Sequence, residues 1–370
     1  MVFVVATGDY NEQVTLEAVT GASATNTITF ESASGVSTDV NVYFAATSSS
    51  NNYVIRLSDA AHYRLRNITV TATGTIYSRA VHGQNGLQDL LIEGCRLTSS
   101  ATSTGSTSAG IYLEPILSES VRIHDSYFSG GAYALYYKNG NGAVSGTEFT
   151  DNVVEDSYNG VHLEDLADVL VTGNRITNPA RTDAQRALYL NNCDAAAASP
   201  SLVANNFLTA TSGNRVLFAA NSDNLRLYHN SLNQRGTGTA LFLLSNPDVE
   251  VKSNILHATS GYAADVSSNP NLDMDYNDLY TTGTYLTRYN GTPLTDLAAW
   301  QSASEQGDNS LSFAPQYLSE TDLHAQAPAL ATAGVFQAAV PDDIDGEVRG
   351  DPPSIGADEY SAAPLQPLAG

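Results

Sequence analysis

Apolar and polar residues alternate in short runs through most of this chain. Residues 110–128 hold two such runs, at 110–113 and 121–123, with a polar turn between them. Alternation with a period of two residues is typical of β-strands that bury one face. Versions of both runs return again and again along the chain, so the pattern predicts a fold made of repeated strands.

The second run occurs nine times between residues 63 and 279. Its copies begin at Tyr63, Leu90, Val121, Thr147, Val169, Ser201, Leu225, Val249 and Leu272, with 22 to 32 residues between successive starts. The first run recurs in step with it. A repeat of this length, in which each copy buries its apolar face by stacking on the next copy, predicts a solenoid.

One column of side chains indicates which kind of solenoid this is. The sixth position of the repeat is Asn152, Asn174, Asn206, Asn230, Asn254 and Asn277 in successive copies, after Cys95 and Ser126 in earlier ones. Asn tolerates the left-handed backbone of a tight turn, and its amide can bond the equivalent group one coil further on. This column fits coils of three short strands.

The repeat resembles the right-handed parallel β-helix superfamily that includes the pectate lyases, and the Asn column resembles the asparagine ladder of that family. The resemblance covers residues 63–280. It implies an all-β, right-handed parallel β-helix of about ten to twelve coils, in which each coil contacts only its neighbours.

Both ends of the chain depart from the regular repeat. Residues 8–35 and the tail up to residue 360 resemble segments of large secreted β-helix proteins of the Bacteroidetes type. We expect irregular first coils over 1–60, regular coils over 61–280, final coils and a C-terminal cap over 281–360, and a linker over 361–370. The resemblance implies that the natural chain carries further domains, and that an uncapped first coil would expose strand edges to association.

The cap is predicted to contain a short helix that begins after Thr295 as its N-cap and buries Trp300. Asp343, Asp345 and Gly346 match the start of a calcium loop, but no ligating Glu follows at the required distance. A turn in which Asp343 or Asp345 pairs with Arg349 is the favoured interpretation.

Composition narrows the choice of partners. The chain of 370 residues has a formal net charge of −23, with two lysines against fourteen arginines. Free nucleic acid is an unsuitable partner, because binding it requires a basic face. The acidic, lysine-poor surface fits either a high-salt habitat or an ordinary acidic secreted protein. No stretch is apolar enough to insert into a membrane and no secretory signal is visible. The resemblance implies an extracellular or bacterial cell-surface location.

Cys95 and Cys193 should not form a disulfide. They belong to coils about four strand spacings apart, roughly 19 Å at about 4.8 Å per strand. A disulfide spans at most about 7 Å between Cα atoms. We therefore expect two small packed side chains.

The first strand of each coil is expected to point an aromatic side chain outward at the same position in most coils. This outward column consists of His82, Tyr112, Tyr136, His162, Tyr189, Phe218, Phe242 and Asp265. Sugars stack on aromatic rings, and the polar ends of Tyr and His bond hydroxyl groups. Stacked aromatic residues also stabilise sheets without any ligand, so both interpretations stay open. In the superfamily, this strand face is where polysaccharide binds.

A second outward column is formed by Glu114, Lys138, Glu164 and Asn191. Lyases of the superfamily use Lys or Arg as a base and acidic residues to bind calcium, which makes Lys138 a catalytic candidate. Glutamates on either side would raise its pKa, whereas a base needs the opposite shift. A ladder of ion pairs is the favoured interpretation of this column.

His162 is the stronger catalytic candidate. It lies in sequence register with Tyr136 and Tyr189 and next to Glu164 and Asp165. A His–Tyr pair can abstract and return a proton at C5 of a uronic acid, and Arg186 could take the carboxylate of such a sugar. Hydrolysis would need two carboxylates on either side of the glycosidic bond. Glu114, Glu164 and Asp165 could supply them, but their spacing in the sequence does not specifically indicate a hydrolase.

Three functions remain open from the sequence. The leading hypothesis is a polysaccharide-binding module that uses the aromatic column, with His82, Tyr112, Phe218 and Phe242 as contact residues. The alternatives are a polysaccharide lyase or C5-epimerase centred on His162, and a stalk or adhesin without a small-ligand site. Polysaccharide is the expected partner, no cofactor is required, and calcium remains a candidate.

Overall fold

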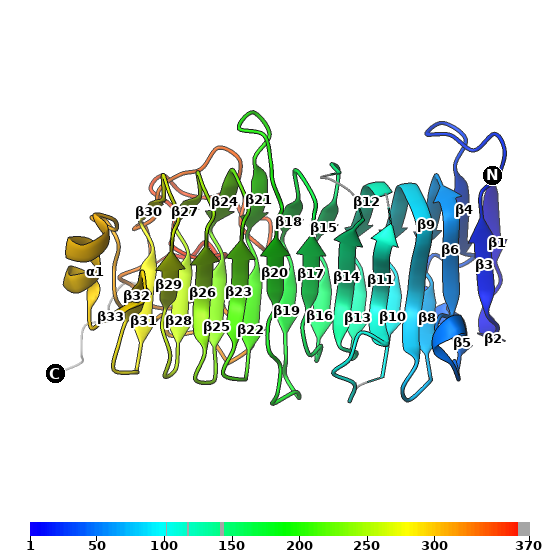
Figure 1. Ribbon diagram of the computed structural model, residues 1–370, viewed down its shortest axis with the longest axis horizontal. Helices are drawn as coiled ribbons and strands as arrows, with labels where there is room; N and C mark the ends of the chain where they lie inside the picture. Colours follow the sequence, from blue (N-terminus) through cyan, green and yellow to red (C-terminus); the bar gives the residue numbers. More distant parts are fainter. Residues whose placement is uncertain (101, 117, 141–143, 362–370) are drawn as a thin grey trace.

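The chain forms one elongated β-solenoid (Figure 1). The computed structural model describes residues 1–100, 102–116, 118–140 and 144–361. Each coil contains three short strands, for example β14 (Tyr133–Asn139), β15 (Glu148–Thr150) and β16 (Val153–Glu155). This confirms the predicted all-β architecture.

Equivalent strands stack in three parallel columns. The first column is β3 (Val14–Glu17), β6 (Ile55–Ala61), β9 (Ser78–Glu93), β11 (Ser108–Ile116), β14, β17 (Val161–Glu164), β20 (Leu188–Asn191), β23 (Arg215–Ala220), β26 (Thr239–Leu244), β29 (Ala264–Ser267) and β32 (Thr287–Tyr289). The second is β1 (Val2–Val5), β4 (Ile28–Ser32), β7 (Tyr63–Arg66), the end of β9, β12 (Ser118–His124), β15, β18 (Leu170–Thr172), β21 (Ser201–Ala204), β24 (Leu225–Tyr228), β27 (Glu250–Lys252) and β30 (Asp273–Asp275).

The third column forms a separate 11-stranded sheet. It contains β2 (Gly8–Asn11), β5 (Val40–Phe44), β8 (Thr69–Ala72), β10 (Arg96–Thr98), β13 (Tyr127–Ser129), β16, β19 (Arg175–Thr177), β22 (Phe207–Ala210), β25 (Ser231–Gln234), β28 (Ile255–Ala258) and β31 (Asp278–Thr281). The other two columns are joined into one 22-stranded sheet, because β9 runs through both. Short 3₁₀ turns at Ser37–Asp39 and Ser49–Asn51 flank β5.

The interior of the solenoid is filled by the apolar residues that alternation predicts to point inward. The side chains of Ile111, Leu135, Val161, Leu188, Leu217 and Leu241 are all buried. Phe128 and Phe149 pack on each other in the core with ring centroids 5.6 Å apart. Burial of this continuous apolar row is the main force that holds one coil on the next.

The asparagine ladder is present. The Nδ2 of Asn174 donates to the Oδ1 of Asn206 at 2.9 Å, and the Nδ2 of Asn206 donates to the Oδ1 of Asn230 at 2.8 Å. The ladder residues do not themselves adopt the left-handed backbone. The residue before each one does so instead, for example Asp151 (φ 57°) and Asn205 (φ 54°). Our explanation of the column by backbone conformation was therefore wrong, and the hydrogen bonds account for it.

A second, shorter ladder follows the first column and was not predicted. It consists of Cys193, Ser222, Asn246 and Asn269. The backbone amide of each of the first three donates a hydrogen bond to the side-chain oxygen of the next, and the Asn246 side chain also donates to Asn269. Cys95 and Cys193 are both buried and free, as expected, and burial raises the pKa of each thiol to about 12. Neither is poised as a reactive thiolate.

A short helix closes the C-terminal end of the solenoid. After β32 the chain turns back as β33 (Thr292–Leu294) and enters α1 (Leu297–Ser304). The N-cap is Asp296 and not Thr295, because the Asp296 carboxylate accepts a hydrogen bond from the Ala299 amide at 2.9 Å. Trp300 is buried as predicted, edge-on to Tyr289 with ring centroids 5.6 Å apart.

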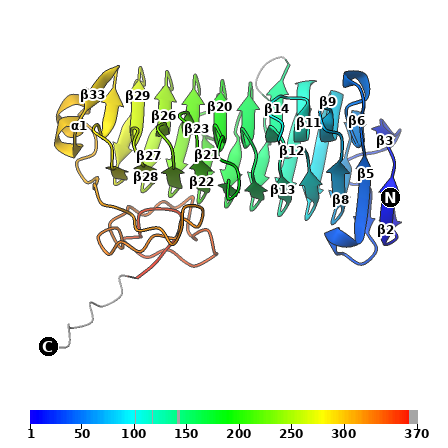
Figure 2. The same ribbon diagram turned by 90° about the horizontal axis from the view of Figure 1, so that it is seen from below.

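The segment after α1 does not continue over the end of the last coil. Residues 312–361 instead run back along the side of the solenoid and pack on β22, β25 and β28 (Figure 2). The Ala357 amide donates to the Ser231 hydroxyl, and the Asn233 side chain donates to the Glu320 carbonyl. The expectation that this tail belongs to an end cap was wrong, because α1 and β33 already cover the end.

The turn near the end of the tail also differs from expectation. The Asp343 carboxylate accepts hydrogen bonds from the amides of Asp345 and Glu347 at 2.9 and 2.8 Å. Arg349 pairs with Glu359 at 3.5 Å and donates to Asn205. The turn is therefore held by side-chain-to-backbone bonds within a short loop, and the predicted ion pair with Arg349 is absent among the described residues.

Most of the predicted linker, residues 362–370, lies outside the described residues. Within the described part of the chain, no helix is long and apolar enough to span a membrane.

Candidate functional site

The outward aromatic column forms one continuous stack along the first-column strands. Parallel register places Tyr112 beside Tyr136, Tyr136 beside His162, and His162 beside Tyr189. The ring centroids from His82 through Tyr112, Tyr136, His162, Tyr189 and Phe218 to Phe242 are successively 5.7, 5.0, 4.5, 4.4, 4.9 and 4.9 Å apart. These distances follow the strand spacing of about 4.8 Å.

The rings are less exposed than an open strip would be. Tyr112, His162 and Phe242 are 8%, 9% and 7% exposed. Arginine side chains lie over four rings, with guanidinium-to-centroid distances of 3.3 Å (Arg79 over Tyr112), 5.0 Å (Arg186 over Tyr189), 5.2 Å (Arg215 over Phe218) and 4.0 Å (Arg215 over Phe242). Cation–π contact and cover by these side chains both stabilise the stack.

The residues that cover the stack occur three positions before an aromatic residue. Strict alternation would place such a residue on the opposite face. Alternation slips at this point of each strand, because two successive residues are both buried, as at Ala134 and Leu135. One extra buried residue moves the side chains that precede it in the strand to the opposite face of the sheet. Tyr133 therefore joins Tyr136 on one face, edge-on with ring centroids 4.9 Å apart.

Arg186 was predicted from the sequence as a site residue, whereas Arg79, Tyr133 and Arg215 were not. The recurring signal was present as Arg or Tyr followed three residues later by an aromatic ring, at residues 79–82, 133–136, 186–189 and 215–218. It was overlooked because uninterrupted alternation was assumed.

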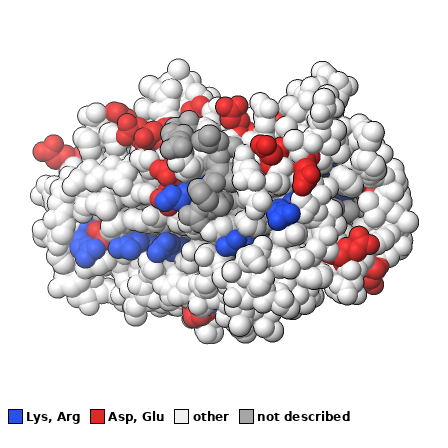
Figure 3. All heavy atoms as spheres, turned by 45° about the vertical axis from the view of Figure 1, so that its right-hand side comes forward, with Lys and Arg blue, Asp and Glu red and all other residues white. Residues whose placement is uncertain are grey.

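Basic side chains form a row along one face of the molecule (Figure 3). The first-column strands and their approaches carry Arg56, Arg79, Lys138, Arg186, Arg215 and Arg288. Arg288 pairs with Asp265, but among the described residues neither Arg186 nor Arg215 has a carboxylate within ion-pair distance. The acidic molecule therefore has a locally positive face.

The charges on this face influence one another. The pKa of Arg215 is lowered by burial and by the nearby Arg186 and Arg288, while Asp265 opposes the shift. The Nε of Arg186 is buried without a hydrogen-bond partner. Burial and two neighbouring arginines, Arg79 and Arg56, lower the pKa of His82 to about 4. An anion bound at this face would offset the repulsion among these arginines and would accept a hydrogen bond from the Arg186 Nε.

Glu164 links the two outward columns. It accepts from Lys138 Nζ at 2.8 Å and contacts His162 Nε2 at 3.0 Å. Burial would raise the pKa of Glu164, but Lys138 and His162 hold it below its ordinary value. The Lys138–Glu164 pair is the ion pair expected from the sequence, whereas the side chain of Glu114 lies outside the described residues.

His162 is held as a packed, neutral ring. Burial lowers its pKa, although the hydrogen bond to Glu164 opposes this shift. Asp165, in the turn after β17, does not join it, because its carboxylate accepts a hydrogen bond from Asn192 of the turn after β20. Burial and Glu164 raise the pKa of Tyr189, which leaves less of its phenolate form available to act as a base. The geometry suits stacking and binding better than proton transfer.

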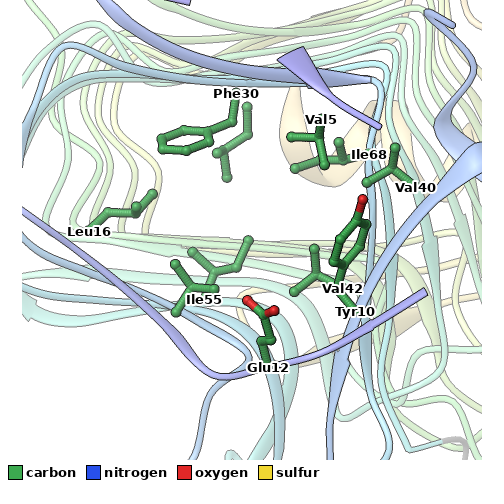
Figure 4. A pocket seen from close by; sticks show the side chains of 11 residues that line it. Val5, Tyr10, Glu12, Leu16, Phe30, Val40, Val42, Ile55 and Ile68 are labelled. Carbon is green, nitrogen blue, oxygen red and sulfur yellow. The ribbon is translucent and has the colours of Figure 1, made fainter. Parts of the chain in front are cut away.

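A separate cavity lies at the N-terminal end of the solenoid. It measures about 310 Å³ and is lined mainly by apolar side chains, with Tyr10 and Glu12 as polar exceptions (Figure 4). Val5, Leu16 and Phe30 face into it from the first coils. This cavity continues the apolar interior of the solenoid and gathers no group of catalytic residues.

Comparison with known proteins agrees with the fold. Residues 118–292 match the family model described as "Right handed beta helix region". Together with the three columns of parallel strands, this match shows that the chain is a right-handed parallel β-helix. A search of curated proteins finds no match.

Proposed function

We propose that this β-helix is a polysaccharide-binding module that holds an anionic glycan along the face formed by the aromatic stack and its arginines. The observation that carries the proposal is the position of Arg186 and Arg215, which lie over stacked rings and have no carboxylate partner among the described residues. In a chain of net charge −23, most positive side chains can find an acidic neighbour. Arg186 and Arg215, which lack one and lie side by side on the same face, are suited to an external carboxylate or sulfate.

The shape of the face supports a polymer as the ligand. Equivalent side chains repeat at the strand spacing along the solenoid axis, from His82 to Phe242. A guanidinium can bond the acidic groups of a sugar while the partly exposed rings of Tyr136, Tyr189 and Phe218 contact its C–H surface. A chain of several sugars can repeat these contacts, whereas a single sugar cannot. An extracellular or cell-surface location is part of the same proposal.

The enzymatic alternative has less support. A lyase or epimerase needs a base that reaches the substrate, but His162 is nearly buried and its Nε2 bonds Glu164. The raised pKa of Tyr189 also opposes the role of a phenolate base.

Binding of soluble glycans by isothermal titration calorimetry tests the proposal. The panel contains a polyuronate, a sulfated glycan and a neutral glucan, each with and without calcium. We expect the wild type to bind an anionic polymer, and the double variant Arg186→Gln/Arg215→Gln to lose at least tenfold in affinity. Arg96→Gln is a matched control, because Arg96 lies 4.1 Å from the Tyr127 ring centroid on the third-column sheet. Equal affinity of the double variant and the control would overturn the proposal.

Three further outcomes identify the alternatives. Rising ultraviolet absorbance during incubation with a polyuronate, lost in His162→Phe although binding is retained, would identify a lyase. Phe keeps the stacked ring and removes the imidazole. Changed uronic-acid stereochemistry in the recovered polymer, seen by NMR, would identify an epimerase. Absence of binding to the whole panel would favour a stalk or adhesin.

A further inference from the structure

Three side chains of the C-terminal tail converge on one point, away from the aromatic face. Potential ligand atoms of His324, Asp345 and Asp358 all lie within 4.8 Å of one another. The three residues are far apart along the tail, and the fold of the tail brings them together. Figure 2 shows that the tail folds back on itself beside the solenoid. The cluster belongs to the segment that packs on β22, β25 and β28.

The orientation of His324 is set from two sides. Its Nδ1 contacts the carboxylate of Asp322, and its Nε2 lies 2.8 Å from Oδ2 of Asp345. The imidazole ring packs edge-on against Phe207 of β22, with centroids 4.9 Å apart. The carboxylate at Nδ1 keeps a proton on that nitrogen, so an ion that displaces the proton shared by Nε2 and Asp345 meets a ring already turned toward the other two acids, as is typical of metal-ligating histidines.

Asp345 is anchored to the solenoid itself. Its Oδ1 accepts a hydrogen bond from Arg175 of β19 at 2.6 Å, which leaves Oδ2 on the side of His324. The guanidinium of Arg175 in turn lies over the Phe207 ring, 5.2 Å from its centroid. The arginine therefore supports the far oxygen of Asp345 and leaves the oxygen that faces the cluster to another partner.

Asp358 is the residue of the cluster that indicates an external ligand. This carboxylate is half-buried, yet among the described residues it has no hydrogen bond or ion pair. Burial and the charges of Asp343, Asp345 and Glu347 disfavour its charged form, whereas His324 favours it. A half-buried carboxylate surrounded by other acids is costly unless a cation offsets the charge.

We propose that His324, Asp345 and Asp358 bind one divalent transition-metal ion of the zinc or manganese class. One imidazole nitrogen and two carboxylate oxygens suit such ions better than calcium, which prefers an all-oxygen shell. Nε2 and Oδ2 are 2.8 Å apart, so they need to separate by only a few tenths of an ångström to reach the roughly 3.0 Å (octahedral) to 3.4 Å (tetrahedral) expected for neighbouring ligands that each lie about 2.1 Å from one ion.

The ion has a structural role. It joins three distant points of the tail and, through Asp345 and Arg175, attaches the tail to the side of the solenoid. Binding to the native state alone stabilises that state in proportion to the logarithm of ion concentration over Kd. The site supplies no group to the aromatic face and is independent of the proposed glycan function.

Calorimetric titration of the untagged full chain tests this site. The chain is stripped with EDTA, dialysed, and titrated separately with zinc, manganese and calcium chloride. We expect one zinc or manganese ion per chain and weaker calcium binding. Asp358→Asn should lower the affinity at least tenfold. Asp342→Asn, which changes an exposed carboxylate nearby, is the matched control and should bind like the wild type.

A second variant tests the positioning role of Asp322. Asp322→Asn should keep one ion per chain and lower its affinity about 10- to 100-fold. Circular dichroism of each variant verifies that the solenoid is intact. Absence of one-to-one binding in the wild type, equal affinity of wild type and Asp358→Asn, or tighter binding of calcium than of zinc and manganese would each overturn the proposal.

Discussion

At the scale of single residues, one ladder asparagine completes several buried hydrogen bonds at once. Asn206 donates to the carbonyls of Val171 and Ala204 and to the next ladder residue. Its Oδ1 accepts hydrogen bonds from the backbone and side chain of Asn174. A residue without the amide would leave these groups buried and unpaired.

Asn206→Ala should therefore lower the free energy of unfolding by about 2 to 3 kcal/mol, the cost of unsatisfied buried groups. Urea unfolding followed by circular dichroism measures this change. Asn26→Ala removes an exposed Asn side chain and should change stability by no more than about 0.5 kcal/mol. Equal effects of both substitutions would contradict the importance of the ladder.

At the scale of elements, the tail and α1 protect parts of the solenoid that would otherwise face water. Asp278 of β31 is buried, and its Oδ1 accepts a hydrogen bond from the Phe313 amide in the tail. Burial raises its pKa to about 8, against an ordinary value of 3.8. The folded chain therefore keeps this acid protonated at neutral pH, whereas the unfolded chain releases the proton.

This difference predicts a specific pH dependence. Between about pH 4 and pH 8 the native state binds more protons at Asp278 than the unfolded state does, so stability falls as pH rises through this window. Asp278→Asn retains the oxygen acceptor and removes the ionisation. The melting temperature of the variant relative to wild type should rise steadily from pH 4 to pH 8 and then level off. A difference that is constant with pH would contradict the assignment.

The cap formed by α1 should stabilise mainly its own end of the solenoid. Trp300→Ala removes a buried indole, and we expect a local loss of about 3 to 5 kcal/mol. Hydrogen exchange should accelerate in residues 273–304 and stay slow in the central coils, because each coil depends on its neighbours. Leu318→Ala, at a side chain 55% exposed, is the control. Uniform acceleration along the chain would show that the solenoid unfolds as one unit.

At the scale of the whole molecule, the net charge of −23 and the basic row oppose each other. An approaching polyanion is repelled at long range and attracted only at contact. The Debye length falls from about 30 Å at 0.01 M salt to about 10 Å at 0.1 M, so added salt removes the long-range repulsion first.

The association rate for an anionic glycan should therefore rise as salt increases from about 0.01 to 0.1 M. Surface plasmon resonance with immobilised polymer measures this rate. Oppositely charged partners show the reverse trend, and a steady fall from the lowest salt would indicate that the local positive face dominates at all distances.

The sequence alone determined the solenoid. Each repeat has strands in which every second residue is apolar, and it can bury these residues and pair its backbone groups only by stacking on the equivalent positions of the next repeat. The same reasoning predicted the order of the aromatic column and the Asn column, because strands in parallel register place equivalent residues of successive repeats next to one another along the solenoid axis. Trp300 was also predicted, as the apolar residue of a short capped helix.

Only the tertiary structure decided the features that depend on contacts outside the repeat. The slip in alternation, which places Arg79, Tyr133 and Arg215 over the aromatic rings, depends on local packing of two buried neighbours. The return of the tail along the third-column sheet brings His324 beside Asp345 and Asp358. Residues brought together in this way share no period, so their meeting is set by how the tail packs and leaves no pattern in the sequence.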